Sequence, residues 1–315
     1  PKADRIPMGL LGAEIVKDPS GYIKVVKILK GENWDKNNRS PLTEIGVNVK
    51  EGDLILAVDG NSTKDVADFY QLLVGTAGKQ IRLKVNSKAT EAGSREVTVI
   101  PIADEQKLYY YSWVQKNIAK VTAATNGRVG YLHIPNMGSE GLNEFVKYYY
   151  AQLNKEALIV DDRGNGGGNV SPHIIERLRR EPVQITVSRN GKPTYEPTEQ
   201  IIGPKIALID EYSASDGDIF AYRFRKHKLG TIIGKRSWGG VVGIRGSLPI
   251  VDGGFLNRPE FSRYNVEGTQ WEIEGHGVDP DIVVENDPYK AFIGEDQQLD
   301  KAIELIKEQM KGKSY

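Results

Sequence analysis

The first hundred residues show short apolar runs separated by glycine, asparagine and aspartate turns, a pattern that predicts a small, mostly β domain. The expected strands are Tyr22–Leu29, Asp53–Val58, Ile81–Val85 and Val97–Ile102. Asp59-Gly60-Asn61 is a strong hairpin-turn signal. A single helical pattern, Val66–Leu73, follows this turn with Asp65 as its expected cap.

From Gly127 onward the pattern changes to an alternation of strands and helices, which is typical of a parallel sheet covered by helices. The expected strands are Val129–Ile134, Ala157–Val160, Ile206–Ile209 and Thr231–Gly234. The expected helices are Leu142–Leu153, Pro172–Arg180, a run that follows Ser215, and the closing amphipathic segment Asp296–Gln309. Residues 235–285 are rich in glycine and predict loops with short strands. We therefore expect three segments: a β domain over 1–102, a connector with a helix over 103–126, and an α/β domain over 127–315.

Composition narrows the function classes. Forty-two basic and forty-two acidic residues give no net charge, so nothing in the electrostatics favours a nucleic-acid partner or a membrane surface. The absence of cysteine excludes disulfides, thiol catalysis and thiolate metal sites. The four histidines, at 133, 173, 227 and 276, lack metal-ligand spacing, so we expect neither a metal nor a cofactor. The first residue is Pro1 rather than Met, which indicates a processed or truncated start and leaves the compartment unknown.

Ser215 is the strongest candidate for a chemical role. It follows the apolar strand Ile206–Ile209 and precedes a helical run, so its hydroxyl is expected at the positive end of a helix, beside backbone N–H groups. Chemistry that builds an oxyanion beside a serine needs this arrangement. The alternative is that Ser215, with Asp216 and Asp218, only caps the helix.

A second signal is the segment DDRGNGGGN, residues 161–169, directly after strand Ala157–Val160. Successive glycines at the carboxyl end of a strand let backbone N–H groups point at a ligand. The segment lacks the Lys-Ser/Thr ending of a phosphate-binding P-loop and is not G-x-G-x-x-G. Loops at the carboxyl ends of neighbouring parallel strands converge, so we expect the glycine loop to face Ser215.

Three motifs in this order, DDRGNGGG, SASDGD and EGHGVDPDI, resemble the catalytic region of the tricorn and tail-specific serine peptidases. Residues 8–13 (MGLLGA) and 49–60 (VKEGDLILAVDG) resemble the PDZ domain of the same family. The resemblance implies a PDZ domain followed by an α/β core of the Clp-peptidase or crotonase-like type. It also implies peptide substrates, a possible homo-oligomer, and further N-terminal domains outside this chain.

The resemblance implies a role for each residue of the site. Ser215 is the nucleophile, the backbone N–H groups of Asp216 and Gly167 form the oxyanion hole, and Glu274 is the carboxylate of the tricorn-type tetrad. Five residues are implied to contact substrate through their backbones: Gly166, Gly168, Gly239, Gly240 and Val241. The loop Gly9, Leu10, Leu11 and Gly12 is implied to bind a C-terminal carboxylate in the PDZ domain, although the insertion Gly31–Arg39 lengthens a loop beside that groove.

Two departures from the family pattern concern the general base. The tail-specific branch uses a lysine about 25 residues beyond the serine, where this chain has Gly240, so a tricorn-type Ser/His mechanism is favoured. The tricorn branch takes its histidine from a Ser-His pair upstream of the PDZ domain, and this chain contains no such pair. We therefore expect the histidine to come from an upstream segment and the chain alone to be close to inactive. His276 and His133 are the internal alternatives, while His173 and His227 are expected to be solvated at helix ends.

Other readings and details stay open. Tricorn enzymes select basic residues with an acid beyond the glycine loop, and residues 182–190 contain none, so that preference is in doubt. The chain could instead be a non-catalytic peptide-binding scaffold built around the PDZ domain. A crotonase-like acyl-CoA enzyme shares the core architecture, but the PDZ-like domain and the Ser215 turn argue against it.

Overall fold

In the computed structural model the chain forms two compact units, Pro1–Lys116 and Asn117–Tyr315. The structure describes residues 6–313, together with the backbone but not the side chains of 245–247. The outermost residues of the predicted domains 1–102 and 127–315, namely 1–5 and 314–315, lie outside the described residues. The boundary between the units falls inside α1 (Gln106–Ala124), the helix expected in the connector.

The first unit is an antiparallel sheet with strand order β1-β2-β3-β5-β6, in which β4 pairs only with β3. Its strands are β1 (Ala13–Lys17), β2 (Ile23–Ile28), β3 (Leu54–Val58), β4 (Asn61–Ser62), β5 (Ile81–Asn86) and β6 (Arg95–Val99). A short 3-10 helix, η1 (Pro41–Thr43), lies between β2 and β3. Alternate side chains of the strands, such as Val25, Ile55 and Leu83, form one apolar core.

Two local predictions in this unit have different outcomes. The hairpin turn is confirmed: Val58 pairs with Asn61, and Asp59 and Gly60 both have positive φ, as a two-residue type I′ loop requires. The helix predicted over Val66–Leu73 is wrong in type and extent, because the segment forms the 3-10 helix η2 (Phe69–Leu73). Its cap is Asp68, whose carboxylate accepts the N–H of Tyr70, and not Asp65.

The second unit contains the predicted parallel sheet, with strand order β15-β12-β11-β8-β7. The strands are β7 (Val129–His133), β8 (Ala157–Asp161), β11 (Lys205–Ile209), β12 (Gly230–Gly234) and β15 (Ile282–Val283). Three helices connect them: α2 (Ser139–Tyr150), α3 (Ser171–Leu178) and α4 (Asp216–Lys226). Each step along the chain adds the next strand on the same side, so right-handed crossovers place these helices on one face.

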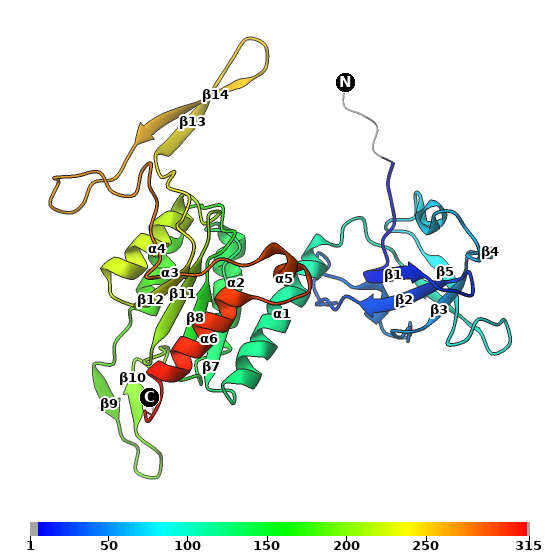
Figure 1. The fold of residues 1–315 in the computed structure, drawn as a ribbon, viewed down its shortest axis with the longest axis horizontal. Helices are drawn as coiled ribbons and strands as arrows, with labels where there is room; N and C mark the ends of the chain where they lie inside the picture. Colours follow the sequence, from blue (N-terminus) through cyan, green and yellow to red (C-terminus); the bar gives the residue numbers. More distant parts are fainter. Residues whose placement is uncertain (1–5, 314–315) are drawn as a thin grey trace. The chain divides into compact units, whose positions relative to one another are not determined.

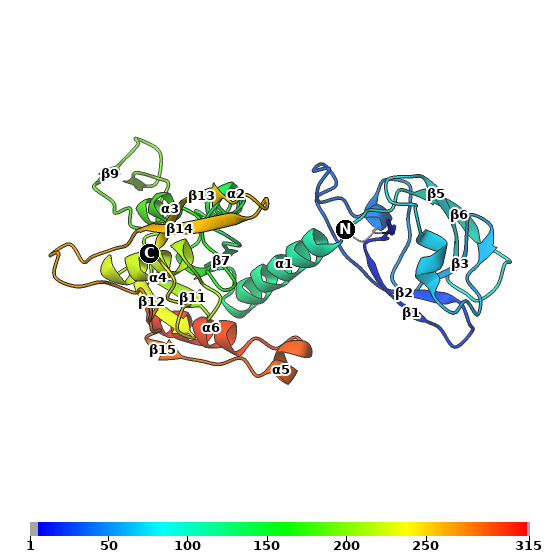
Figure 2. The same ribbon diagram turned by 90° about the horizontal axis from the view of Figure 1, so that it is seen from above.

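The other face of the sheet is covered by α6 (Gln297–Gln309) and the second half of α1. Val121 of α1 and Ile306 of α6 pack with Tyr131, Ile159 and Leu208 of the central strands. Figure 2 shows α6 on one side of β11 and β12, with α2 and α3 on the opposite side. The central strands are buried on both faces, which explains why they are continuous apolar runs in the sequence.

Several elements of this unit were not predicted individually from the sequence, although short strands were expected within residues 235–285. They are the hairpin β9 (Gln184–Thr186) with β10 (Thr194–Glu196), the hairpin β13 (Gly243–Pro249) with β14 (Phe255–Phe261), and the short helix α5 (Pro288–Phe292). Figure 1 shows the two hairpins projecting from the core in different directions. Among the described helices, none is both long and apolar enough to cross a membrane.

Candidate active site

Two loops leave the same edge of the parallel sheet. Strand β8 ends at Asp161 and leads into the glycine loop, and its neighbour β11 ends at Ile209 and leads into the Ser215 turn. Because β8 and β11 are parallel partners, both loops lie at their carboxyl ends. The topology therefore allows the two loops to converge as predicted, and the distances between their atoms show how closely they approach.

Ser215 occupies the N-cap position of α4 in an unusual backbone conformation. Its φ is 55° and its ψ is −114°, and its side chain makes no capping hydrogen bond. Positive φ is uncommon for a residue with a side chain, and such strain is concentrated at functional sites. The alternative in which the Ser215 hydroxyl caps the helix is therefore wrong. Ser215 is half-buried at the amino end of α4, where the helix dipole favours negative charge.

The glycine loop touches the Ser215 turn directly. A Cβ atom added at Gly167 would lie 2.6 Å from the Cβ of Ser215 and 3.1 Å from the amide nitrogen of Asp216. The φ of Gly167 is +98°, which disfavours any other residue there. The amide of Ala214 also donates to the carbonyl of Asn165 over 2.8 Å. The structure thus brings together Ser215, Asp216 and Gly167, with the exposed Gly166 and Gly168 on either side of Gly167.

Asn165 holds the glycine loop and was not predicted as a site residue. Its Oδ1 accepts the N–H of Gly167 over 3.0 Å, while its Nδ2 donates to the carbonyl of Ile134 and to Asp162. Burial raises the pKa of Asp162 well above its usual range, and the neighbouring carboxylates of Asp161 and Asp210 raise it further. The sequence did contain a signal for this role. Asn165 stands between two glycines, and its side-chain amide can make hydrogen bonds that glycine, which has no side chain, cannot make.

Asp218 links helix α4, which begins beside Ser215, to the next loop. Its side chain is fully buried, and its Oδ1 accepts the hydroxyl of Ser237 and, over 2.8 Å, the N–H of Gly239. Burial raises the pKa of Asp218, against the lowering effect of these bonds and of the Ser215 backbone N–H. A carboxylate at the third helical position that accepts the N-cap N–H is one half of a capping box. That half fixes the backbone of Ser215 without using its hydroxyl.

The carboxylate of Asp216 has a separate, structural task. It accepts the backbone N–H of Ser171 over 2.9 Å and the hydroxyl of Ser171 over 2.6 Å, at the start of α3. The backbone amide nitrogen of Asp216 lies 3.1 Å from a Cβ atom added at Gly167. As the first residue of α4, it has no carbonyl four residues earlier within the helix to accept that N–H.

Glu274 lies with the predicted substrate segment. Its Oε2 accepts the amides of Val241 and Val242 over 2.7 and 2.8 Å. The carbonyl of Gly239 accepts the amide of Gly275 over 2.7 Å, and Arg263 donates to the carbonyl of Val241. Residues 239–241 therefore form a loop before β13, fixed by Asp218 on one side and by Glu274 on the other.

The internal histidines are engaged elsewhere. His133 is buried, its Nε2 lies 2.9 Å from the carbonyl of Arg163, and burial lowers its pKa. His276 is exposed, with Nε2 2.7 Å from Asp279 and Nδ1 3.2 Å from Arg236. His173 and His227 are exposed near the ends of α3 and α4, as expected. Among residues 6–313, no cluster of histidine and acidic side chains could hold a metal ion.

A buried ion network supports the edge of the sheet beneath these loops. Arg163 makes two hydrogen bonds to the carboxylate of Asp161, 2.8 and 2.5 Å long, and two more to Asp296, both 2.9 Å long. Asp296 is also the N-cap of α6, so the network joins that helix to the start of the glycine loop. The hydroxyl of Tyr131 donates to Asp161 from below.

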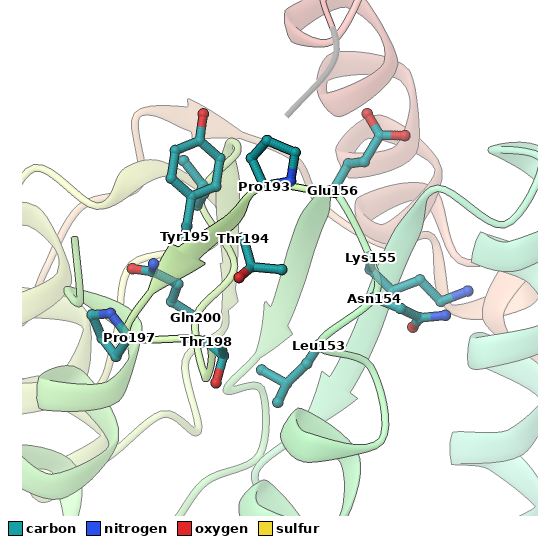
Figure 3. Close-up of a pocket in the computed structure, with 11 residues that line it drawn as sticks. Leu153, Asn154, Lys155, Glu156, Pro193, Thr194, Tyr195, Pro197, Thr198 and Gln200 are labelled. Carbon is teal, nitrogen blue, oxygen red and sulfur yellow. The ribbon is translucent and has the colours of Figure 1, made fainter. Parts of the chain in front are cut away.

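A cavity of about 390 Å³ lies at the opposite edge of the sheet. It is lined by residues 153–156, which precede β8, and by residues of the segment 193–202, which precedes β11 (Figure 3). Those positions are at the amino ends of the strands, whereas Ser215 follows a carboxyl end. The cavity is therefore not part of the candidate active site.

In the first unit, the predicted carboxylate loop has internal partners. The amide of Gly9 donates to the carbonyl of Leu73, and that of Leu10 to the carbonyl of Ile102. The amide of Gly12 donates to the side chain of Glu105. Binding of a free C terminus at this loop stays a prediction.

Comparison with known proteins defines the class. The profile of "Peptidase family S41" matches residues 128–284, and that of "Tricorn protease PDZ domain" matches residues 9–104. "Tricorn protease homolog 1" of Streptomyces coelicolor is 39% identical over 297 residues, which cover 94% of this chain and 28% of the relative. "Tricorn protease homolog" of Saccharolobus solfataricus is 40% identical over 308 residues, or 97% of this chain and 28% of the relative.

A solved structure described as "Crystal structure of the tricorn protease" superposes with a TM-score of 0.86 at 35% identity, covering 97% of this chain and 29% of that one. These likenesses define a serine peptidase core preceded by a PDZ domain. The chain belongs to peptidase family S41, and within it to the tricorn type. It spans 28% of the length of each of the two tricorn homologues.

Proposed function

We propose that this chain is the catalytic part of a tricorn-type serine peptidase that hydrolyses peptides through an acyl-enzyme on Ser215. The observation that carries the proposal is the contact between the strained Ser215 turn and Gly167, at the amino end of α4. A hydroxyl released from helix capping and placed beside backbone amides is what formation of a tetrahedral oxyanion requires.

In the proposed reaction, the Oγ of Ser215 attacks the scissile carbonyl carbon while its proton passes to a general base. The oxyanion accepts hydrogen bonds from the N–H of Asp216 and the N–H of Gly167. To donate to the oxyanion, the Gly167 N–H gives up its bond to Oδ1 of Asn165. The C–N bond then breaks, and the base returns the proton to the leaving amine. Water attacks the ester by the same route, which releases the acid product and restores Ser215.

We propose that the base is a histidine from a segment upstream of this chain, oriented by Glu274. The engagement of His133 with a backbone carbonyl and of His276 with Asp279 supports a source outside the chain. So does the length of the tricorn relatives, most of which lies outside the region they share with this chain. The chain alone is then expected to be nearly inactive, and peptidase activity inhibited by PMSF from residues 1–315 would contradict this.

We further propose that substrate backbone pairs with Gly239, Gly240 and Val241 and passes Gly166 and Gly168. The bonds from Asp218 and Glu274 fix this segment relative to α4. They also engage the N–H groups of Gly239 and Val241, so a substrate that pairs with these groups displaces the two carboxylates from them. The steady progression of parallel strands, with their connecting helices on one face, supports a core of the Clp-peptidase or crotonase-like type. Assembly into a homo-oligomer remains part of the proposal.

The test compares the longer protein that contains this chain with its Ser215→Ala and Glu274→Gln variants. Ser215→Ala is expected to lower peptide hydrolysis at least about 10³-fold, as loss of a nucleophile does. Glu274→Gln is expected to lower kcat and shift the acidic limb of the pH profile. If Ser215→Ala hydrolyses peptides as fast as the unaltered protein, Ser215 is not the nucleophile and the proposal fails. If the unaltered protein hydrolyses no peptide, the non-catalytic scaffold is favoured instead.

A further inference from the structure

The carboxylate of Glu105 occupies the loop where a PDZ domain would receive a peptide's C terminus. Glu105 precedes the first residue of α1, and its Oε1 accepts the amide of Gly12 over 2.6 Å. The two residues are 93 positions apart, so no local turn explains the contact. The backbone N–H of Ala13, the first residue of β1, also bonds to Glu105. A carboxylate that receives two successive amides at the start of an edge strand imitates a bound C terminus.

The backbone around Glu105 holds it at this loop. Leu10 and Ile102 exchange N–H and carbonyl groups over 2.7 and 2.9 Å, which sets the segment before α1 alongside the loop. Leu108, one turn into α1, is 1% exposed and would lie 3.1 Å from a Cβ atom at Gly12. The turn that carries Glu105 is therefore packed into the first unit.

The start of the loop, at Gly9, is also closed to a ligand by close packing and by its own hydrogen bond. Gly9 is buried, and a Cβ atom there would lie 2.1 Å from Thr76 and 2.9 Å from Pro101. Its amide already donates to the carbonyl of Leu73 in η2, over 2.9 Å. Burial raises the pKa of Tyr70 in η2, and the charge of Glu105 raises it further. Glu105 thus lies at the start of β1 and within electrostatic range of Tyr70 in η2.

We propose that Glu105 is an internal ligand of the Gly9–Gly12 loop, which keeps the PDZ unit closed to peptide C termini until the first turn of α1 is displaced. The contact is an autoinhibitory one and does not depend on peptidase activity. Burial raises the pKa of Glu105, against the lowering effect of its two amide bonds, so mild acid favours release of the carboxylate.

The experiment titrates this chain with a short hydrophobic peptide that has a free C-terminal carboxylate, and with the same peptide as its C-terminal amide. The unaltered chain is expected to bind neither. The Glu105→Ala variant is expected to bind the carboxylate form at least about 10-fold more tightly than the unaltered chain does, and the amide form no better, because a hydrogen-bonded charge has been removed from the loop. Glu14→Gln, which removes a neighbouring exposed glutamate paired with Lys27, is the matched control and should behave as the unaltered chain.

A second measurement uses the unaltered chain, so it does not depend on whether a variant folds. The NMR chemical shift of the Gly12 amide proton in the unaltered chain should change with pH along the titration curve of a single carboxyl group, one whose pKa lies above the usual glutamate range. An amide shift that is constant through acid titration overturns the proposal. Equal affinity of the unaltered and Glu105→Ala chains for the carboxylate peptide also overturns it.

Discussion

At the scale of single residues, the site depends on groups that restrain Ser215 without using its hydroxyl. Asp218 accepts the N–H groups of Ser215 and Gly239, and Asn165 holds the amide of Gly167. Both side chains are polar and buried. Truncating either one would leave its hydrogen-bond partners unsatisfied inside the protein, and an unsatisfied buried group is more destabilising than the loss of a whole hydrogen-bonded pair. The two residues therefore position the Ser215 turn and the glycine loop.

Gly167→Ala tests the close approach of the two loops. Its methyl group would meet the Cβ of Ser215 at 2.6 Å, and its φ of +98° is unfavourable for alanine. We expect a loss of unfolding free energy of about 1–3 kcal/mol and at least roughly tenfold slower reaction of Ser215 in the longer protein. Gly164→Ala is the matched control, since its φ is +71° but nothing lies within 4 Å of the added carbon. Equal reactivity of both variants would contradict the contact.

Asp218→Ala and Asp218→Asn separate positioning from packing. Alanine leaves the hydroxyl of Ser237 and the amide of Gly239 unpaired, so urea unfolding should show a loss of about 1–3 kcal/mol. Asparagine keeps an acceptor oxygen and should restore most of the stability. If positioning depends on that acceptor, the asparagine variant should also recover kcat relative to alanine, with KM little changed. A kcat of the alanine variant equal to that of the unaltered protein would refute the positioning role.

At the scale of elements, strand β11 begins with a buried lysine. Lys205 is 7% exposed, its Nζ lies 3.3 Å from the carbonyl of Gly203, and burial lowers its pKa to about 8. A lysine whose folded pKa lies below its unfolded value near 10.5 loses its proton first in the folded chain. The unfolded chain then binds more protons between pH 8 and 10.5, so the contribution of this group to stability rises across that window.

Lys205→Met is therefore expected to stabilise the protein at pH 7 by up to about 3 kcal/mol, because the cost of the buried charge is removed. The advantage over the unaltered protein should shrink as pH rises from about 8 to 10.5. Urea unfolding of both proteins at several pH values measures the difference. An advantage that stays constant across this pH range would show that folding does not lower the pKa of Lys205.

At the scale of the whole molecule, much of the architecture could be predicted because the strands of the core are continuous apolar runs. The carboxyl ends of β8 and β11 also indicated where Ser215 and the glycine loop would meet. The hairpins β9–β10 and β13–β14 could not be predicted in the same way. Every side chain of β9 and β14 is exposed, so no burial pattern marks them.

The supporting contacts were also beyond sequence reasoning. Asp218 and Gly239 become neighbours only through the fold, and so do Glu105 and Gly12. Judged by residue type alone, Asp218 and Glu105 are equally typical of a helix cap and of a solvated acid. Arg163 and Asp296 are 133 residues apart, yet they connect the glycine loop to α6. Contacts between distant segments are fixed by topology, which periodicity does not encode.

The central claim is that Ser215 is the nucleophile. The most direct measurement treats the longer protein with a fluorophosphonate, digests it, and locates the adduct by mass spectrometry. We expect one adduct, on the peptide that contains Ser215, and none in the Ser215→Ala variant. An adduct on another serine, or no adduct in a protein that still hydrolyses peptides, would contradict it.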